Sequence, residues 1–116
     1  YATLVSPDGT TSTLEQSDVS ITSIETWTSP ATGIEYPSGW KIDISSLELS
    51  LELEPVLVDS EFAGSRYTPA AYWEGEVRVV GTRQGKDVSG RGFVELVGYD
   101  PSQLDGPEDP ALYPGR

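Results

Sequence analysis

The sequence predicts an all-β domain, folded as a single antiparallel up-and-down sheet of seven to eight strands. Three observations support this prediction. Apolar and polar residues alternate with a period of two, turn-forming residues separate the alternating segments, and no segment has the spacing of an amphipathic helix. The length of 116 residues corresponds to one domain, which is large enough to bury one apolar core.

The first strands are expected on both sides of a tight turn. Residues 1–5 and 11–15 have weak strand patterns, and Ser-Pro-Asp-Gly at 6–9 is typical of a turn, because proline fixes φ and glycine accepts a positive φ. Residues 19–27 are rich in Ile, Thr and Val, which favour strands. Residues 30–39 contain two prolines and two glycines, and are therefore expected to form a loop.

The clearest alternation lies in the centre of the chain. Leu49, Leu51 and Leu53 alternate with polar residues, which gives one apolar and one solvated face. The remaining elements follow from the same patterns: strands at 40–44, 72–80 and 92–99, loops at 59–69 and 84–90, and an irregular, proline-rich acidic tail at 100–116.

Several such strands are compatible with either a β-sandwich or an antiparallel barrel. The consecutive, hairpin-like segments favour an up-and-down order over a Greek key. The chain also has no cysteine, and so lacks the disulfide that is typical of immunoglobulin domains.

The composition excludes several functions. With 19 acidic and 7 basic residues, the net charge is −12, which disfavours binding to nucleic acid and to anionic membranes. No apolar run approaches the ~20 residues that a membrane-inserted helix needs. The chain has no Cys, His or Asn, which excludes disulfides, thiolate nucleophiles, a Ser-His-Asp triad and N-glycosylation. No metal or cofactor is therefore expected.

The chain begins at Tyr1 and contains no methionine. We expect a mature product or a piece of a longer protein. No signal peptide pattern is visible in it, so the localisation stays open.

Four segments resemble one protein family. They are WTSPATG at 27–33, YPSGW at 36–40, YWEG at 72–75 and GRGFVELVGY at 90–99. In this order they resemble the C-terminal lipocalin-like (calycin) domain of the carotenoid 1,2-hydratase (hydroxyneurosporene synthase) and predicted secreted hydrolase family, also called AttH-like. The resemblance covers residues 1–99. Val97 departs from it, since the family often has threonine there.

The resemblance implies a lipocalin-like barrel over residues 1–99, and an N-terminal companion barrel elsewhere in the same protein. Relatives include hydratases and cyclases, many of them secreted or periplasmic, whose ligands lie mostly in the first barrel or between the two. The implied ligand is a small hydrophobic molecule of isoprenoid or polyketide type.

Two carboxylates are candidate catalytic acids. Glu74 shares a strand face with Tyr72, Glu76 and Arg78, and would be desolvated only if this face lined the barrel. The alternation of side chains along the strand favours an outward orientation of Glu74, because Val77 lies on the other face and needs a core to pack in.

Glu95 alternates with Phe93, Val97 and Tyr99, and is expected on an apolar face. There it either forms a structural ion pair with Arg78 or Arg91, or acts as a pocket acid.

The aromatic residues are candidate ligand contacts, although core packing explains them as simply. They are Trp27, Trp40, Tyr72, Trp73 and Tyr99. We expect no base beside Ser29 to activate it, so a hydrolase function finds no nucleophile there.

Three functions remain open at this point. The chain is the non-catalytic or co-catalytic half of a two-barrel enzyme acting on an apolar molecule, a carrier without chemistry, or a structural domain with a filled interior. We expect the chain to be inactive alone, with hydration or cyclisation chemistry belonging to the whole parent protein.

Overall fold

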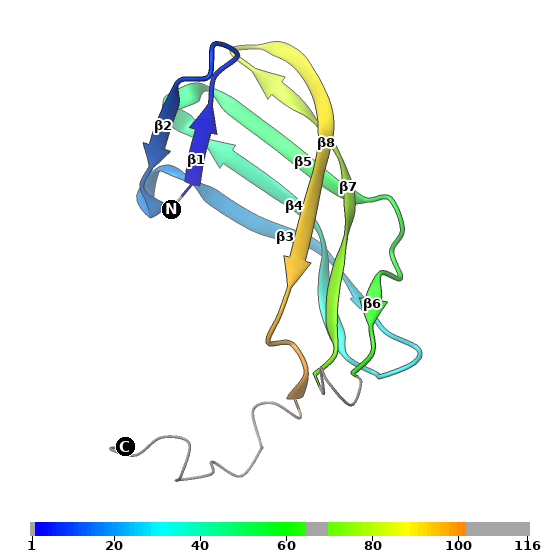
Figure 1. Ribbon diagram of the computed structural model, residues 1–116. Coiled ribbons are helices and arrows are strands. Elements are labelled where there is room, and N and C mark those ends of the chain that lie inside the picture. The colour runs from blue at the N-terminus through cyan, green and yellow to red at the C-terminus, as the bar shows by residue number, and fades with distance from the viewer. Residues whose placement is uncertain (1, 65–69, 102–116) are drawn as a thin grey trace, which may run out of the picture.

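The computed structural model describes residues 2–64 and 70–101 of the chain. Within these ranges eight strands are connected by turns, loops and two short 3-10 helices (Figure 1). The strands are β1 (Ala2–Val5), β2 (Thr11–Leu14), β3 (Ser20–Thr28), β4 (Glu35–Ile44), β5 (Leu49–Pro55), β6 (Glu61–Phe62), β7 (Tyr72–Arg83) and β8 (Lys86–Leu96), and the 3-10 helices are η1 (Gln16–Asp18) and η2 (Ser45–Leu47).

The strands form a two-stranded and a six-stranded antiparallel sheet. β1 pairs with β2 in the small sheet, and the large sheet has the order β3-β4-β5-β7. β7 pairs with β8 along one edge, and with β5 and then β6 along the other. Figure 1 shows that the large sheet is strongly curved. The prediction of an antiparallel all-β fold of the lipocalin-like type is confirmed. Within the described part of the large sheet, β3, β8 and the short strand β6 are edge strands, and no β3–β8 ladder is present.

Two predicted loops contain strand residues. β4 begins at Glu35 instead of 40, because the turn between Ser29 and Ile34 already reverses the chain: the Ser29 N–H donates to the Ile34 carbonyl at 2.9 Å. Pro37 is tolerated because β4 pairs there only with β3. The predicted loop at 59–69 contains the short strand β6.

The connection between the last two strands is shorter than predicted. β7 and β8 are joined by Gln84 and Gly85 alone, with φ of 51° and 76°, as in a tight two-residue hairpin turn. Residues 86–90 therefore lie within β8, which ends at Leu96 instead of 99. Of the predicted tail, only Asp100 and Pro101 are among the described residues.

The large sheet has one packed face. We call the face that carries Trp40, Leu53 and Val79, which are cross-strand partners, the inner face, and the opposite face the outer face. The packed core is a cluster of buried residues at one end of the inner face: Ile34, Tyr36, Trp40, Ala71, Trp73 and Val77. Partly buried residues of β3, β5, β7 and β8 pack against it.

A second set of inner-face residues is less covered. The register aligns one residue from each of five neighbouring strands: Ile21, Ile42, Leu51, Gly81 and Val88. We call this set the apolar row. Ile21 is 65% exposed, and the other side chains of the row are half-buried. At a strand spacing of about 4.8 Å, the apolar row crosses about 19 Å of the sheet.

No helix in the described part of the chain is long and apolar enough to cross a membrane.

Gly81 permits the close approach of β5 and β7. A Cβ at this position would collide with the carbonyl oxygen of Ser50 and lie 2.9 Å from the Cα of Leu51. We expect Gly81→Ala to lower the free energy of unfolding by about 2 to 3 kcal/mol, as measured by urea denaturation.

The matched control is Gly90→Ala, in the neighbouring strand, because nothing lies within 4 Å of a Cβ there. It should change stability by less than about 1 kcal/mol. Equal losses in the two variants would contradict the close approach.

Candidate functional site

A carboxylate joins β6 to the turn between β3 and β4. One oxygen of Glu61 accepts a hydrogen bond from the Ser29 hydroxyl at 2.6 Å. The other accepts from the Thr32 hydroxyl at 2.7 Å and from the Tyr36 hydroxyl at 2.8 Å. Three donors from one hairpin thus converge on one acceptor from a distant segment. We call these four residues the Glu61 network.

The network fixes the protonation states of its members. Burial raises the pKa of Glu61, but the hydrogen bonds from Ser29, Thr32 and Tyr36 lower it more, so its pKa lies below that of an ordinary carboxyl. The pKa of Tyr36 is raised far above its usual value by burial, by its hydrogen bond to Glu61 and by the charge of that carboxylate. Glu61 is therefore an ionised acceptor, and does not have a proton to donate near neutral pH.

The same network corrects the expectation for Ser29. A carboxylate does lie beside this serine, but the Ser29 oxygen already accepts the N–H groups of Ala31 at 3.2 Å and Thr32 at 3.1 Å. Ser29 is 2% exposed. Its hydroxyl therefore shapes the turn, which is a structural role.

Glu61 is not among the predicted site residues, because the pattern of its segment predicts a loop and its partners lie 25 to 32 residues away. The available signal was the pair of hydroxyl residues, Ser29 and Thr32, in a turn bounded by proline and glycine.

The aromatic candidates divide between the core and the outer face. Trp40 and Trp73 are buried in the packed core with ring centroids 5.9 Å apart, and the Trp73 Nε1–H donates to the Val58 carbonyl at 2.8 Å. Trp27 stacks on Tyr36, and Tyr99 contacts the same ring at 5.9 Å.

Tyr72 differs, since it lies on the outer face and stacks on Phe62 at 5.2 Å. Four of the five candidates therefore fill the packed end or border it. A ligand contact by any of the five stays a prediction.

Both candidate acids lie on the outer face. Glu74 of β7 and Glu95 of β8 are directly opposite each other in the register. Apolar residues do flank Glu95, but they are not covered: Phe93 is 66% and Val97 61% exposed, and Val94 and Leu96 are the β8 residues that pack on the core.

The ion pair expected for Glu95 is absent from residues 2–64 and 70–101. Arg91 instead lies 3.5 Å from Glu76. Glu95 is exposed, so the outer face does not desolvate it. A catalytic role for Glu74 or Glu95 stays a prediction.

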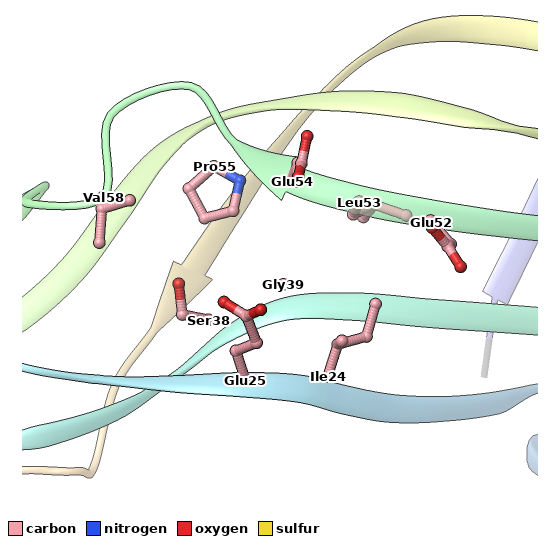
Figure 2. Close-up of a pocket in the computed structure, with 9 residues that line it drawn as sticks. All are labelled: Ile24, Glu25, Ser38, Gly39, Glu52, Leu53, Glu54, Pro55 and Val58. Atoms are coloured by element: carbon pink, nitrogen blue, oxygen red, sulfur yellow. The ribbon is translucent and has the colours of Figure 1, made fainter.

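A cleft of about 340 Å³ opens where β4 and β5 separate. Their ladder ends at Trp40 and Leu53, whereas β5 continues along β7 to Pro55. Figure 2 shows Pro55 and Val58 on one side of this cleft and Glu25 and Ser38 on the other. Glu52 and Glu54 also line it, so its rim is acidic and poorly suited to an apolar molecule.

The apolar row is the better candidate for an apolar ligand. Its four side chains are all apolar and share one face, whereas the Glu61 network and the tryptophans fill the other end of the inner face. Nowhere in the described ranges do three or more carboxylates come together in a way that could hold a metal ion.

Comparisons with known proteins agree with this fold. Residues 1–99 match the family model described as AttH-like. Kievitone hydratase of Fusarium solani subsp. phaseoli is 40% identical over 72 residues, which are 62% of this chain and 20% of that protein.

Two crystal structures are similar to the chain. One, assigned as an AttH of Nitrosomonas europaea, has a TM-score of 0.68 and 35% identity, and the match covers 84% of this chain and 29% of that one. Kievitone hydratase of Nectria haematococca has a TM-score of 0.66 and 27% identity, with 81% and 28% covered. The chain thus spans less than a third of each of these relatives.

Glu61→Ala should lower the free energy of unfolding by about 3 kcal/mol near neutral pH, because it leaves a buried tyrosine hydroxyl and two further donors without their acceptor. Since the folded pKa of Glu61 is lowered, its stabilisation is present above the unfolded carboxyl pKa and is lost as the pH falls through the folded value. The difference between wild type and variant should therefore shrink below about pH 4, as measured by denaturation across pH.

Glu54→Ala, on the exposed outer face, is the control and should cost less than about 0.5 kcal/mol. A loss for Glu61→Ala that stays constant down to acidic pH would contradict the role of the ionised carboxylate.

Glu95→Gln should raise the free energy of unfolding by about 0.3 kcal/mol, because it removes the repulsion between two like charges that face each other across β7 and β8. Thermal denaturation at low and high salt would measure this gain, which should diminish with added salt. Glu76→Gln removes the acid beside Arg91 and should give no such gain. Destabilisation by Glu95→Gln would show that Glu95 has a favourable partner.

Proposed function

The chain belongs to the AttH-like family, and on this premise we propose that it is the non-catalytic, co-binding half of a site for a small apolar molecule. The site belongs to a longer, hydratase-like parent protein with a companion barrel. A relative is named for the hydration of kievitone, a reaction that adds water to an organic molecule. Hydration or cyclisation by the parent is consistent with this relationship.

The observation that carries the proposal is the partial exposure of the apolar row. Ile21 is 65% exposed, and Ile42 and Leu51 in the same row are half-buried. Apolar surface is therefore in contact with water. Covering such a side chain is favourable by about 25 cal/mol per Å² of apolar area. An apolar molecule lying on the row would supply this cover.

The proposal assigns the chemistry to the companion barrel. The inner-face carboxylate of the Glu61 network is ionised and fully engaged by hydroxyls, so it is unsuited to protonate a double bond. Glu74 and Glu95 lie on the outer face, and therefore have no part in the proposed site.

A carrier without chemistry is the weaker candidate for this domain alone. Small-molecule sites bury most of the surface of their ligand. The described strands enclose no such cavity, because the β3 and β8 edges are not joined and the packed end is filled. A second wall is needed, which favours a shared site.

Ile21→Asp should weaken the binding of a neutral apolar dye such as Nile red by about fivefold, because it places a charge on the apolar row. The measurement is a fluorescence titration of the full 116-residue chain, with amide chemical shifts recorded by NMR to locate the dye.

Ile24→Asp is the matched control, on the same strand but on the outer face, where Ile24 is 51% exposed. It should leave the affinity nearly unchanged, and both variants should stay folded, because both positions are already exposed. Equal effects of the two variants, or shifts confined to the outer face, would refute the proposed site.

A further inference from the structure

The cations of the chain are distributed unevenly over the two faces of the sheet. Five lysines and arginines lie in the described ranges. By strand parity Lys41, Arg78 and Arg91 lie on the outer face, whereas Arg83 and Lys86 lie on the inner face.

The outer-face cations have acidic neighbours. Lys41 lies 3.8 Å from Asp43, and Arg91 lies 3.5 Å from Glu76. Arg78 faces Glu54 across the β5–β7 ladder. Arg78 forms no ion pair within residues 2–64 and 70–101, but each of these three cations has a carboxylate as its neighbour on the same face.

Arg83 and Lys86 are placed differently. They are directly opposite each other across the hairpin turn, in a pair of like charges that is unfavourable by itself. Neither forms an ion pair within residues 2–64 and 70–101. Two acids lie beside this turn: Glu48, whose carbonyl accepts the Gln84 N–H at 2.9 Å, and Asp87, which by strand parity lies on the outer face. Neither carboxylate forms an ion pair with Arg83 or Lys86.

These two cations also border the apolar row. Arg83 follows Gly81 by two residues, and Lys86 precedes Val88 by two, so each lies about 7 Å from the row on the same face. The inner-face acids, Glu25 and Glu61, belong to the opposite end, in line with Pro55 and Trp73. The inner face is therefore positive at one end of an apolar surface, in a chain of net charge −12.

We propose that the ligand of the apolar row is an anionic amphiphile, with a carboxylate or a similar head group bound by Arg83 and Lys86. Its apolar body lies across the row, from Val88 at the β8 edge to Ile21 at the β3 edge. This inference rests on the proposed function, and adds the chemical class of the ligand. Local cations are required for it, because the net charge of the chain repels an anion elsewhere.

Protection of the free β8 edge is the alternative explanation of these charges, since lysine at an edge strand discourages pairing with other chains. That role requires no ligand, and it predicts that the affinity for an amphiphile does not depend on the charge of its head group. Binding measurements with matched amphiphiles separate the two explanations.

The experiment compares dodecanoate, dodecanol and dodecylammonium, titrated below micelle formation into the full 116-residue chain by calorimetry, with NMR to locate the contacts. Dodecanoate should bind about fivefold more tightly than dodecanol, and added salt should remove this preference. Arg83→Gln/Lys86→Gln should lower the affinity for dodecanoate by about fivefold and leave dodecanol unchanged.

The control is Lys41→Gln/Arg91→Gln, which makes the same change in net charge on the outer face. It should alter the affinity for dodecanoate less than about twofold. Equal binding of dodecanoate and dodecanol, tighter binding of dodecylammonium, or an equal effect of the two double variants would overturn the head-group inference. The proposed function would survive these results if Ile21→Asp still weakened binding. Absence of binding by all three amphiphiles and by Nile red would overturn both.

Discussion

The Glu61 carboxylate is the interaction on which the asymmetry of the inner face depends. It holds the turn between β3 and β4 against β6, and it does so with three hydroxyl donors that a buried, ionised acceptor can engage at once. This attachment places Tyr36 beneath Trp27 and beside the paired indoles of Trp40 and Trp73. One end of the curved sheet is thereby filled with aromatic side chains.

The other end retains apolar surface because the side chains of the apolar row are only partly covered. Gly81 has no side chain on the apolar row, and its close contact with β5 would exclude one. Gly90, the cross-strand partner of Val79, also has no side chain, and nothing lies within 4 Å of the position of its Cβ. The inner face thus has a packed end, which stabilises the fold, and the partly exposed apolar row, which another surface could cover. A shared site between two domains is the arrangement that such a division favours.

Much of the fold could be predicted from sequence, because period-two alternation reports directly which residues share a face. Leu49, Leu51 and Leu53 share one face of the sheet, as their alternation predicts. The alternation of Phe93, Glu95 and Val97 was misleading, because Gly92, Val94 and Leu96 supply the covered face, and glycine carries no hydropathic signal. The Glu61 network could be predicted only in part. Ser29 and Thr32 mark the turn, but strand pairing between distant segments brings their acceptor to them, and local spacing does not encode that contact.

The position of β7 has a consequence for how the molecule opens. It is paired on both sides over nearly its whole length, with β8 on one side and with β5 and β6 on the other. Between β5 and β6 the pairing continues through two backbone hydrogen bonds, from the Val56 N–H to the Glu76 carbonyl and from the Glu74 N–H to the Ser60 carbonyl. Its amides are therefore released only when the whole sheet separates, whereas β3 at the free edge and the β1–β2 hairpin detach at lower cost. We therefore expect hydrogen exchange to begin at the edge strands and to reach last β7, which pairs with β5 and β6 on one side and with β8 on the other.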